Sequence, residues 1–60
     1  MRARELEKIL FEDGWYVKSQ KGSHRQYKHP NKPGKVTIPF HNGDVDKRPA
    51  DSILKQAGLK

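Results

Sequence analysis

The residues of this sequence best suited to chemistry are three histidines, His24, His29 and His41. Histidine is the side chain whose ordinary pKa, about 6.5, lets it take up and release a proton near neutral pH. All three lie between Gly14 and Gly43, a segment that also carries six lysine or arginine residues and no aspartate or glutamate. A proton carrier among positive charges is suited to a substrate rich in phosphate, and nucleic acid is the first candidate.

The charge of the chain is concentrated in this middle segment. The 60 residues include 13 lysine or arginine and 7 aspartate or glutamate residues, for a formal net charge of +6. Residues 1–13 sum to −1 (three basic, four acidic) and residues 44–60 to +1 (four basic, three acidic), so the whole excess lies between them. A basic surface that only maintains solubility, or one that binds an acidic protein, remains an alternative to a nucleic-acid site.

Composition excludes several classes of protein. The chain has no cysteine, so neither a disulfide framework nor a cysteine-ligated zinc site is available, and we expect a cytoplasmic protein. No apolar run approaches the ~20 residues that a membrane span requires. The histidine spacing does not resemble a zinc site, so we expect neither a metal nor a cofactor.

Helical periodicity appears at the two ends of the chain. Near the N-terminus, apolar residues recur at helical spacing up to a stop at Gly14: Ala3, Leu6, Ile9 and Leu10. Near the C-terminus, we expect Asp46 to be the N-cap, Pro49 to lie in the first turn and Gly58 to end the helix in a left-handed conformation. The apolar stripe of this second helix is formed by Ala50, Ile53, Leu54 and Ala57.

The middle of the chain predicts three strands, at 15–20, 23–28 and 35–39, with a tight turn at Lys21-Gly22. The order α-β-β-β-α predicts one α+β domain over residues 1–60. In it, a three-stranded antiparallel sheet has both helices on one face and leaves the other face open.

Alternation along the second strand predicts which side chains lie on the open face. Tyr27 is the only large apolar side chain there, so we expect it to face the helices together with Arg25. His24, Gln26 and Lys28 then face outward, unless a bulge inverts the alternation. By the same alternation, Val36 and Ile38 of the third strand face the helices.

Three ordered runs of this sequence resemble one protein family. Lys21-Gly22-Ser23-His24-Arg25-Gln26-Tyr27, preceded by Gly14-Trp15, looks like the signature of the HicA toxins. The runs 36–41 and 53–59 are similar to that family's third strand and terminal helix. The chain departs from the family pattern at Pro49-Ala50, where a Thr-Leu pair is common, and at Arg25, often a second histidine or a small residue. The resemblance implies a fold like that of a double-stranded-RNA-binding domain.

The resemblance also implies an activity. HicA toxins are messenger-RNA interferases of type II toxin–antitoxin pairs, so it implies a metal-independent endoribonuclease that inhibits translation and is neutralised by a HicB-type antitoxin. His24 would be the catalytic residue, as acid, base or both. Candidate RNA contacts are Lys21, Ser23, Arg25, Lys28 and His41. The alternative is a small RNA-binding module of the same fold that does not cleave its ligand.

The remaining histidines and aromatic residues have simpler interpretations. His41 is either a second proton carrier or phosphate contact, or a loop residue that hydrogen-bonds its turn. His29 precedes a proline in a loop, and we expect it at the surface. We expect Trp15 to pack beneath the helices and Tyr16, on the opposite side of the strand, to be a candidate for stacking on a base.

Overall fold

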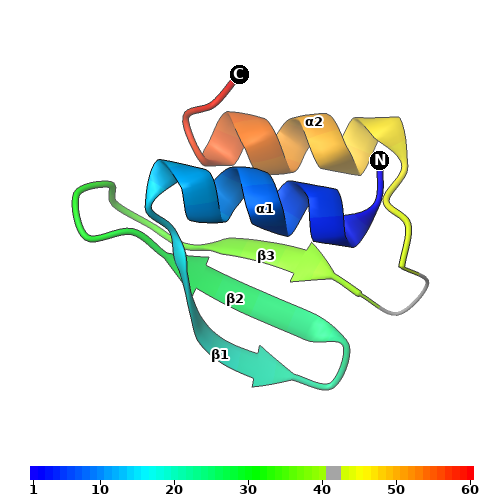
Figure 1. Ribbon diagram of the computed structural model, residues 1–60, viewed down its shortest axis with the longest axis horizontal. Coiled ribbons are helices and arrows are strands. Elements are labelled where there is room, and N and C mark those ends of the chain that lie inside the picture. The colour runs from blue at the N-terminus through cyan, green and yellow to red at the C-terminus, as the bar shows by residue number, and fades with distance from the viewer. Residues whose placement is uncertain (41–42) are drawn as a thin grey trace.

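The computed structural model describes residues 1–40 and 43–60 and has the expected order of elements (Figure 1). They are α1 (Ala3–Asp13), β1 (Tyr16–Lys21), β2 (His24–Lys28), β3 (Val36–Pro39) and α2 (Lys47–Gln56). The predicted α+β architecture is confirmed. Each strand begins one residue later than expected, and the tight turn lies at Gly22-Ser23 rather than Lys21-Gly22.

The three strands form one antiparallel sheet in the order β1-β2-β3. In the β1–β2 pair, Val17 lies opposite Tyr27 and Ser19 lies opposite Gln26, so Lys18 between them is an extra, bulged residue. Such a bulge shifts the alternation of the strand that contains it. The bulge lies in β1, and the alternation of β2 is therefore the regular one that the sequence predicts.

The core lies between the helices and one face of the sheet. Side chains from both helices form one buried cluster with Trp15, Tyr27, Val36, Ile38 and Val45. The inward positions predicted for Tyr27, Val36 and Ile38 are confirmed, with exposed fractions of 1% or less. β1 is the edge strand farthest from the helices in Figure 1, and all six of its residues are exposed.

The helix ends follow the expected stop signals. α1 ends at Gly14, whose φ of 104° is in the left-handed region where glycine is favoured. Asp46 is the N-cap of α2, although its side chain makes no capping hydrogen bond, and Pro49 lies in the first turn. Gly58 also has a positive φ, and the following Leu59 N–H donates to the Leu54 carbonyl at 2.8 Å.

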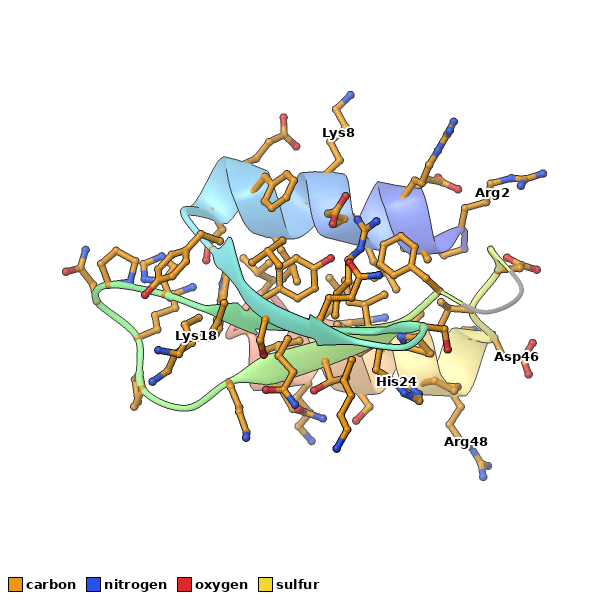
Figure 2. All side chains as sticks on the ribbon, turned by 90° about the horizontal axis from the view of Figure 1, so that it is seen from below. Arg2, Lys8, Lys18, His24, Asp46 and Arg48 are labelled. Atoms are coloured by element: carbon orange, nitrogen blue, oxygen red, sulfur yellow. The ribbon has the colours of Figure 1, made fainter. Side chains whose placement is uncertain are left out.

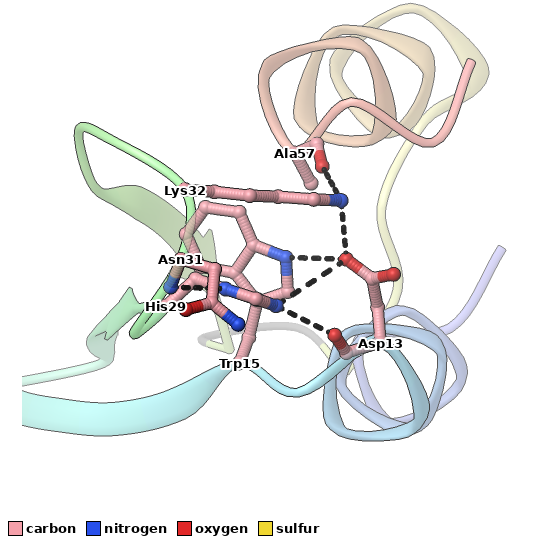
Figure 3. Close-up of polar contacts among 6 residues, drawn as sticks. All are labelled: Asp13, Trp15, His29, Asn31, Lys32 and Ala57. Atoms are coloured by element: carbon pink, nitrogen blue, oxygen red, sulfur yellow. Dashed lines mark hydrogen bonds and ion pairs between the residues drawn. The ribbon is translucent and has the colours of Figure 1, made fainter.

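His29 is part of the structural framework, so the expectation of a surface residue is wrong. Its side chain is only 8% exposed and its ring packs edge-on against Trp15, with 5.3 Å between the ring centroids. Nδ1 accepts a hydrogen bond from the Asn31 backbone N–H, so Nε2 carries the proton and donates to the Asp13 carbonyl at 2.7 Å (Figure 3). Both ring nitrogens are therefore engaged: Nδ1 binds within the loop after β2, and Nε2 holds that loop against α1.

The same loop is tied to both helices through Lys32. Its Nζ donates to the Asp13 carboxylate at 2.5 Å and to the Ala57 carbonyl at 3.0 Å, at the C-terminal end of α2 (Figure 3). Trp15 Nε1 also donates to that carboxylate. The hydrogen bond from Lys32 is the main reason that the pKa of Asp13 is lowered. Lys32 thus acts as a structural cation rather than a member of an exposed basic surface.

Candidate active site on the open face of the sheet

The open face of the sheet carries polar and basic side chains from all three strands. Residues directly opposite each other in an antiparallel sheet share a face, so the register assigns the members of this face. Gln26 lies opposite both Ser19 and Thr37, and Ser19 Oγ donates to its side-chain Oε1 at 3.3 Å. We define the open face as Tyr16, Ser19, Lys21, His24, Gln26, Lys28, Thr37 and Pro39.

His24 is the first residue of β2 and is exposed on this face, where strand alternation predicts it. It lies opposite Lys21 on one side and Pro39 on the other. Directly opposed residues have Cβ atoms about 4.5–5.5 Å apart, so the Lys21 ammonium can reach a group bound at the imidazole. Figure 2 shows His24 and Lys18 on the side of the sheet away from Lys8 of α1.

The other cations of the open face lie at the two ends of β2. Lys21 is beside His24, and half-buried Lys28 is at the far end of the strand, opposite Tyr16. Tyr16 is 49% exposed, whereas Trp15 is only 3% exposed, as their alternation predicts. An aromatic side chain next to a lysine is an arrangement that binds a base and its phosphate together.

The backbone before His24 is held by two hydrogen bonds. The Ser23 carbonyl accepts from the Phe40 N–H at 2.7 Å, and the Gly22 carbonyl accepts from the Gln20 side-chain amide at 3.2 Å. Ser23 itself is half-buried in the turn. These bonds fix the hairpin tip, which we define as Gly22–His24, with respect to the ends of both neighbouring strands.

Arg25 lies on the opposite side of β2 from His24. Its Nη1 donates to the Glu7 carboxylate of α1 at 2.9 Å, and its guanidinium carbon lies 4.2 Å from the centroid of the Phe40 ring. The hydrogen bond to Glu7 is the main reason that the pKa of Arg25 is raised. The structure therefore brings Lys21, His24 and Lys28 to one face and separates Arg25 from them.

Glu7 is a residue that sequence reasoning missed. Its Oε2 accepts from Arg25 and also from the Tyr27 hydroxyl, at 2.5 Å, and its side chain is 16% exposed. Burial and this contact raise the pKa of Tyr27. In the sequence, Glu7 is one of four acidic residues within the first 13, and nothing in the spacing distinguishes it from its neighbours.

Two further observations describe what the chain offers to ligands. His41 lies outside the described residues. Within 1–40 and 43–60, no group of three or more histidine, cysteine, aspartate or glutamate side chains could hold a metal ion. In those same ranges, no helix is long and apolar enough to cross a membrane.

Comparison with known proteins decides the family. The model of the HicA toxin of bacterial toxin–antitoxin systems matches residues 3–59. The chain belongs to the HicA toxin family. This HicA-family chain is also similar to a chain of a solved structure, "Toxin-Antitoxin complex from Streptococcus pneumoniae". The two share 33% sequence identity with a TM-score of 0.83, and the match covers 98% of each chain. The comparison with curated proteins gives no match.

Proposed function

We propose that this HicA-family toxin is a metal-independent endoribonuclease that cleaves messenger RNA and uses His24 to transfer protons. The observation that carries the proposal is the exposed position of His24 on the open face, directly opposite Lys21. A histidine in this place is accessible to an RNA strand. Lysines on the same face attract that strand whatever its sequence.

The chemistry requires a proton carrier and positive charge. A base removes the proton of the ribose 2′-hydroxyl, and the 2′-oxygen attacks the adjacent phosphorus as the bond to the 5′-oxygen breaks. An acid then protonates the leaving 5′-oxygen, and a 2′,3′-cyclic phosphate remains. His24 is suited to either proton transfer, and the Lys21 ammonium, opposite His24, would stabilise the charge that grows on the phosphoryl oxygens. A second proton carrier, if the reaction uses one, is a role for His41.

Contacts away from the reacting phosphate would come from Lys28 and Tyr16 on the open face. Lys28 is suited to a neighbouring phosphate and Tyr16 to stacking on a base. Ser23 in the turn is a further candidate contact. Arg25 stays a predicted RNA contact from the sequence, although the Glu7 carboxylate already binds its guanidinium.

The partner we propose is a HicB-type antitoxin that covers the open face. The similar Streptococcus pneumoniae structure is itself a toxin–antitoxin complex. A protein that covers His24 and the lysines would exclude RNA from the same surface, so it would both bind and inhibit the toxin. We propose that the toxin acts in the cytoplasm, where messenger RNA is translated.

The test is expression of the wild type and of His24→Ala, with growth and message integrity followed after induction. We expect growth arrest and message cleavage for the wild type and neither for the variant. His24→Ala should fold normally, because truncation of an exposed side chain changes stability by about 0.5 kcal/mol or less. Thr37→Ala, a truncation on the same face, is the matched control and should stay active.

Two results would contradict the proposal. If folded His24→Ala still cleaves RNA, His24 is not the proton carrier. If the purified wild type binds RNA and leaves it intact, the chain is a binding module of the same fold without catalysis.

A further inference from the structure

We propose that Glu7 and Arg25 are positioning residues that hold the hairpin tip, and with it His24, in a fixed place on the sheet. The inference rests on the proposed function, since it assigns these two residues a role in the catalytic step. It concerns the helix-facing side of β2, where Glu7 binds the Arg25 guanidinium. Five side chains are involved: Glu7, Gln20, Arg25, Tyr27 and Phe40.

The first step of the argument is the anchor on α1. Glu7 Oε2 accepts hydrogen bonds from both Arg25 and Tyr27, two residues on the same side of β2. Tyr27 is fully buried, and the Glu7 and Arg25 side chains are 16% and 32% exposed. Charge-assisted bonds from a planar guanidinium are stronger and more directional than neutral ones. α1 therefore holds Arg25 in one orientation.

The second step connects Arg25 to the hairpin tip. Arg25 Nε donates to Gln20 Oε1 at 3.2 Å, and the amide nitrogen of the same Gln20 side chain donates to the Gly22 carbonyl. On the other side, the Arg25 guanidinium stacks on Phe40, whose backbone N–H donates to the Ser23 carbonyl. The two residues before His24 are thus each held by a residue that Arg25 contacts.

The third step is the consequence for catalysis. His24 is next to Arg25 in the strand, so a shift of the Arg25 backbone also moves the imidazole. Proton transfer depends steeply on placement, and a displacement of about 1 Å can reduce the rate about 100-fold. An anchored Arg25 therefore favours a high kcat without contacting the RNA.

A direct phosphate contact by Arg25 leads to opposite expectations. In that case Glu7 competes with RNA for the guanidinium, so Glu7→Gln would strengthen RNA binding. Arg25→Lys would keep the contact as a point charge. In the positioning role, both substitutions instead reduce kcat and leave KM nearly unchanged.

The experiment measures kcat and KM for RNA cleavage by the wild type, Glu7→Gln and Arg25→Lys, at a temperature where circular dichroism shows each to be folded. We expect kcat to fall by roughly 10- to 100-fold in both variants, with KM unchanged within about twofold. Amide hydrogen exchange supplies a readout independent of activity. The Phe40 N–H should exchange faster in both variants, because its bond to the Ser23 carbonyl is less well held.

Asp51→Asn on α2 is the matched control. It also removes one negative charge and one ion pair, that between Asp51 and Lys60 at 2.5 Å. It should change neither kcat nor Phe40 exchange. Unchanged kcat in Glu7→Gln and Arg25→Lys would overturn the inference while the proposed function stands, as would an equal loss in Asp51→Asn. A wild type that does not cleave RNA would overturn the proposed function and the catalytic part of this inference. Phe40 exchange would still show whether the anchor holds the hairpin tip.

Discussion

Removal of two lysines from the open face should change how RNA binding responds to salt. Lys21 lies opposite His24, and Lys28 lies four residues beyond His24 on the same strand. At about 3.3 Å per residue, the two lysines are about 13 Å apart along β2, so we expect them to contact different phosphates. The double variant Lys21→Ala with Lys28→Ala then loses two independent contacts.

The magnitude follows from counterion release. For single-stranded RNA, each phosphate contact contributes about 0.7 to the slope of log K against the logarithm of salt concentration, so the double variant should lose about 1.4. When the salt concentration is raised from about 50 to about 200 mM, the affinity of both proteins should fall. The factor of this fall should be about seven times smaller for the variant than for the wild type. His24→Ala should leave the slope unchanged, because the proposal assigns the phosphate contacts to the lysines and the proton transfer to His24.

Salt titrations of binding to an uncleavable RNA, with a 2′-deoxy group at the scissile position, measure these slopes. The matched control is Arg4→Ala with Lys8→Ala, which removes two exposed charges from α1. Lys8 projects on the opposite side of the molecule from His24 (Figure 2), so this variant should keep the wild-type slope.

An equal loss of slope in the α1 variant would refute the reasoning, because net charge alone would then explain binding. A loss of slope in His24→Ala equal to that of the lysine pair would make His24 mainly a binding residue.

Three other predictions concern the metal, the pH response and the framework. Cleavage should persist in excess EDTA, because the RNA 2′-hydroxyl and a proton carrier suffice; complete inhibition that a divalent ion reverses would contradict this mechanism. The lowered pKa of Asp13, due first to the hydrogen bond from Lys32, stabilises the fold above the ordinary carboxyl pKa of 3.8, and this contribution is lost as pH falls through the lower folded value. Urea unfolding at a series of pH values should therefore show a shallower loss of stability below about pH 4 for Asp13→Asn than for the wild type, and parallel curves would argue against the ion pair. Gly14→Ala should reduce the free energy of unfolding by roughly 1–3 kcal/mol, because φ is +104° and the new Cβ would lie 2.9 Å from His29 Nε2. Gly34→Ala, with a φ of +81° and nothing within 4 Å, should cost less; equal midpoints in thermal unfolding would show that the contact with His29 is unimportant.

The sequence predicts the parts of this molecule that depend on local patterns. Residues close together in the sequence determine three such features: the apolar stripes of the two helices, the left-handed glycines at their ends and the alternation of β2. Tyr27 alone determines the face of His24, because one large apolar side chain in a half-polar strand has to be buried.

Contacts between distant segments could not be predicted in this way. His29 contacts the Asp13 carbonyl 16 residues away, and Glu7 meets Arg25 18 residues away. The partners of His29 and Glu7 are determined by how the loop after β2, the sheet and α1 pack together. Many other acidic or basic residues have similar neighbours in the sequence, so the sequence does not distinguish these two. Val45 was missed as a core residue for a similar reason, since a single apolar residue among polar neighbours has no periodicity.

The bulge at Lys18 has a consequence for insertions and deletions in β1. Lys21 is five residues from Tyr16, an odd spacing that would place the two on opposite faces of a regular strand. The extra residue changes this odd–even count, so both lie on the open face and Gln20 turns toward Arg25. Deletion of Lys18 would restore strict alternation and exchange the faces of either Tyr16-Val17 or Ser19–Lys21. This strand should therefore tolerate many substitutions at Lys18 but no change in length.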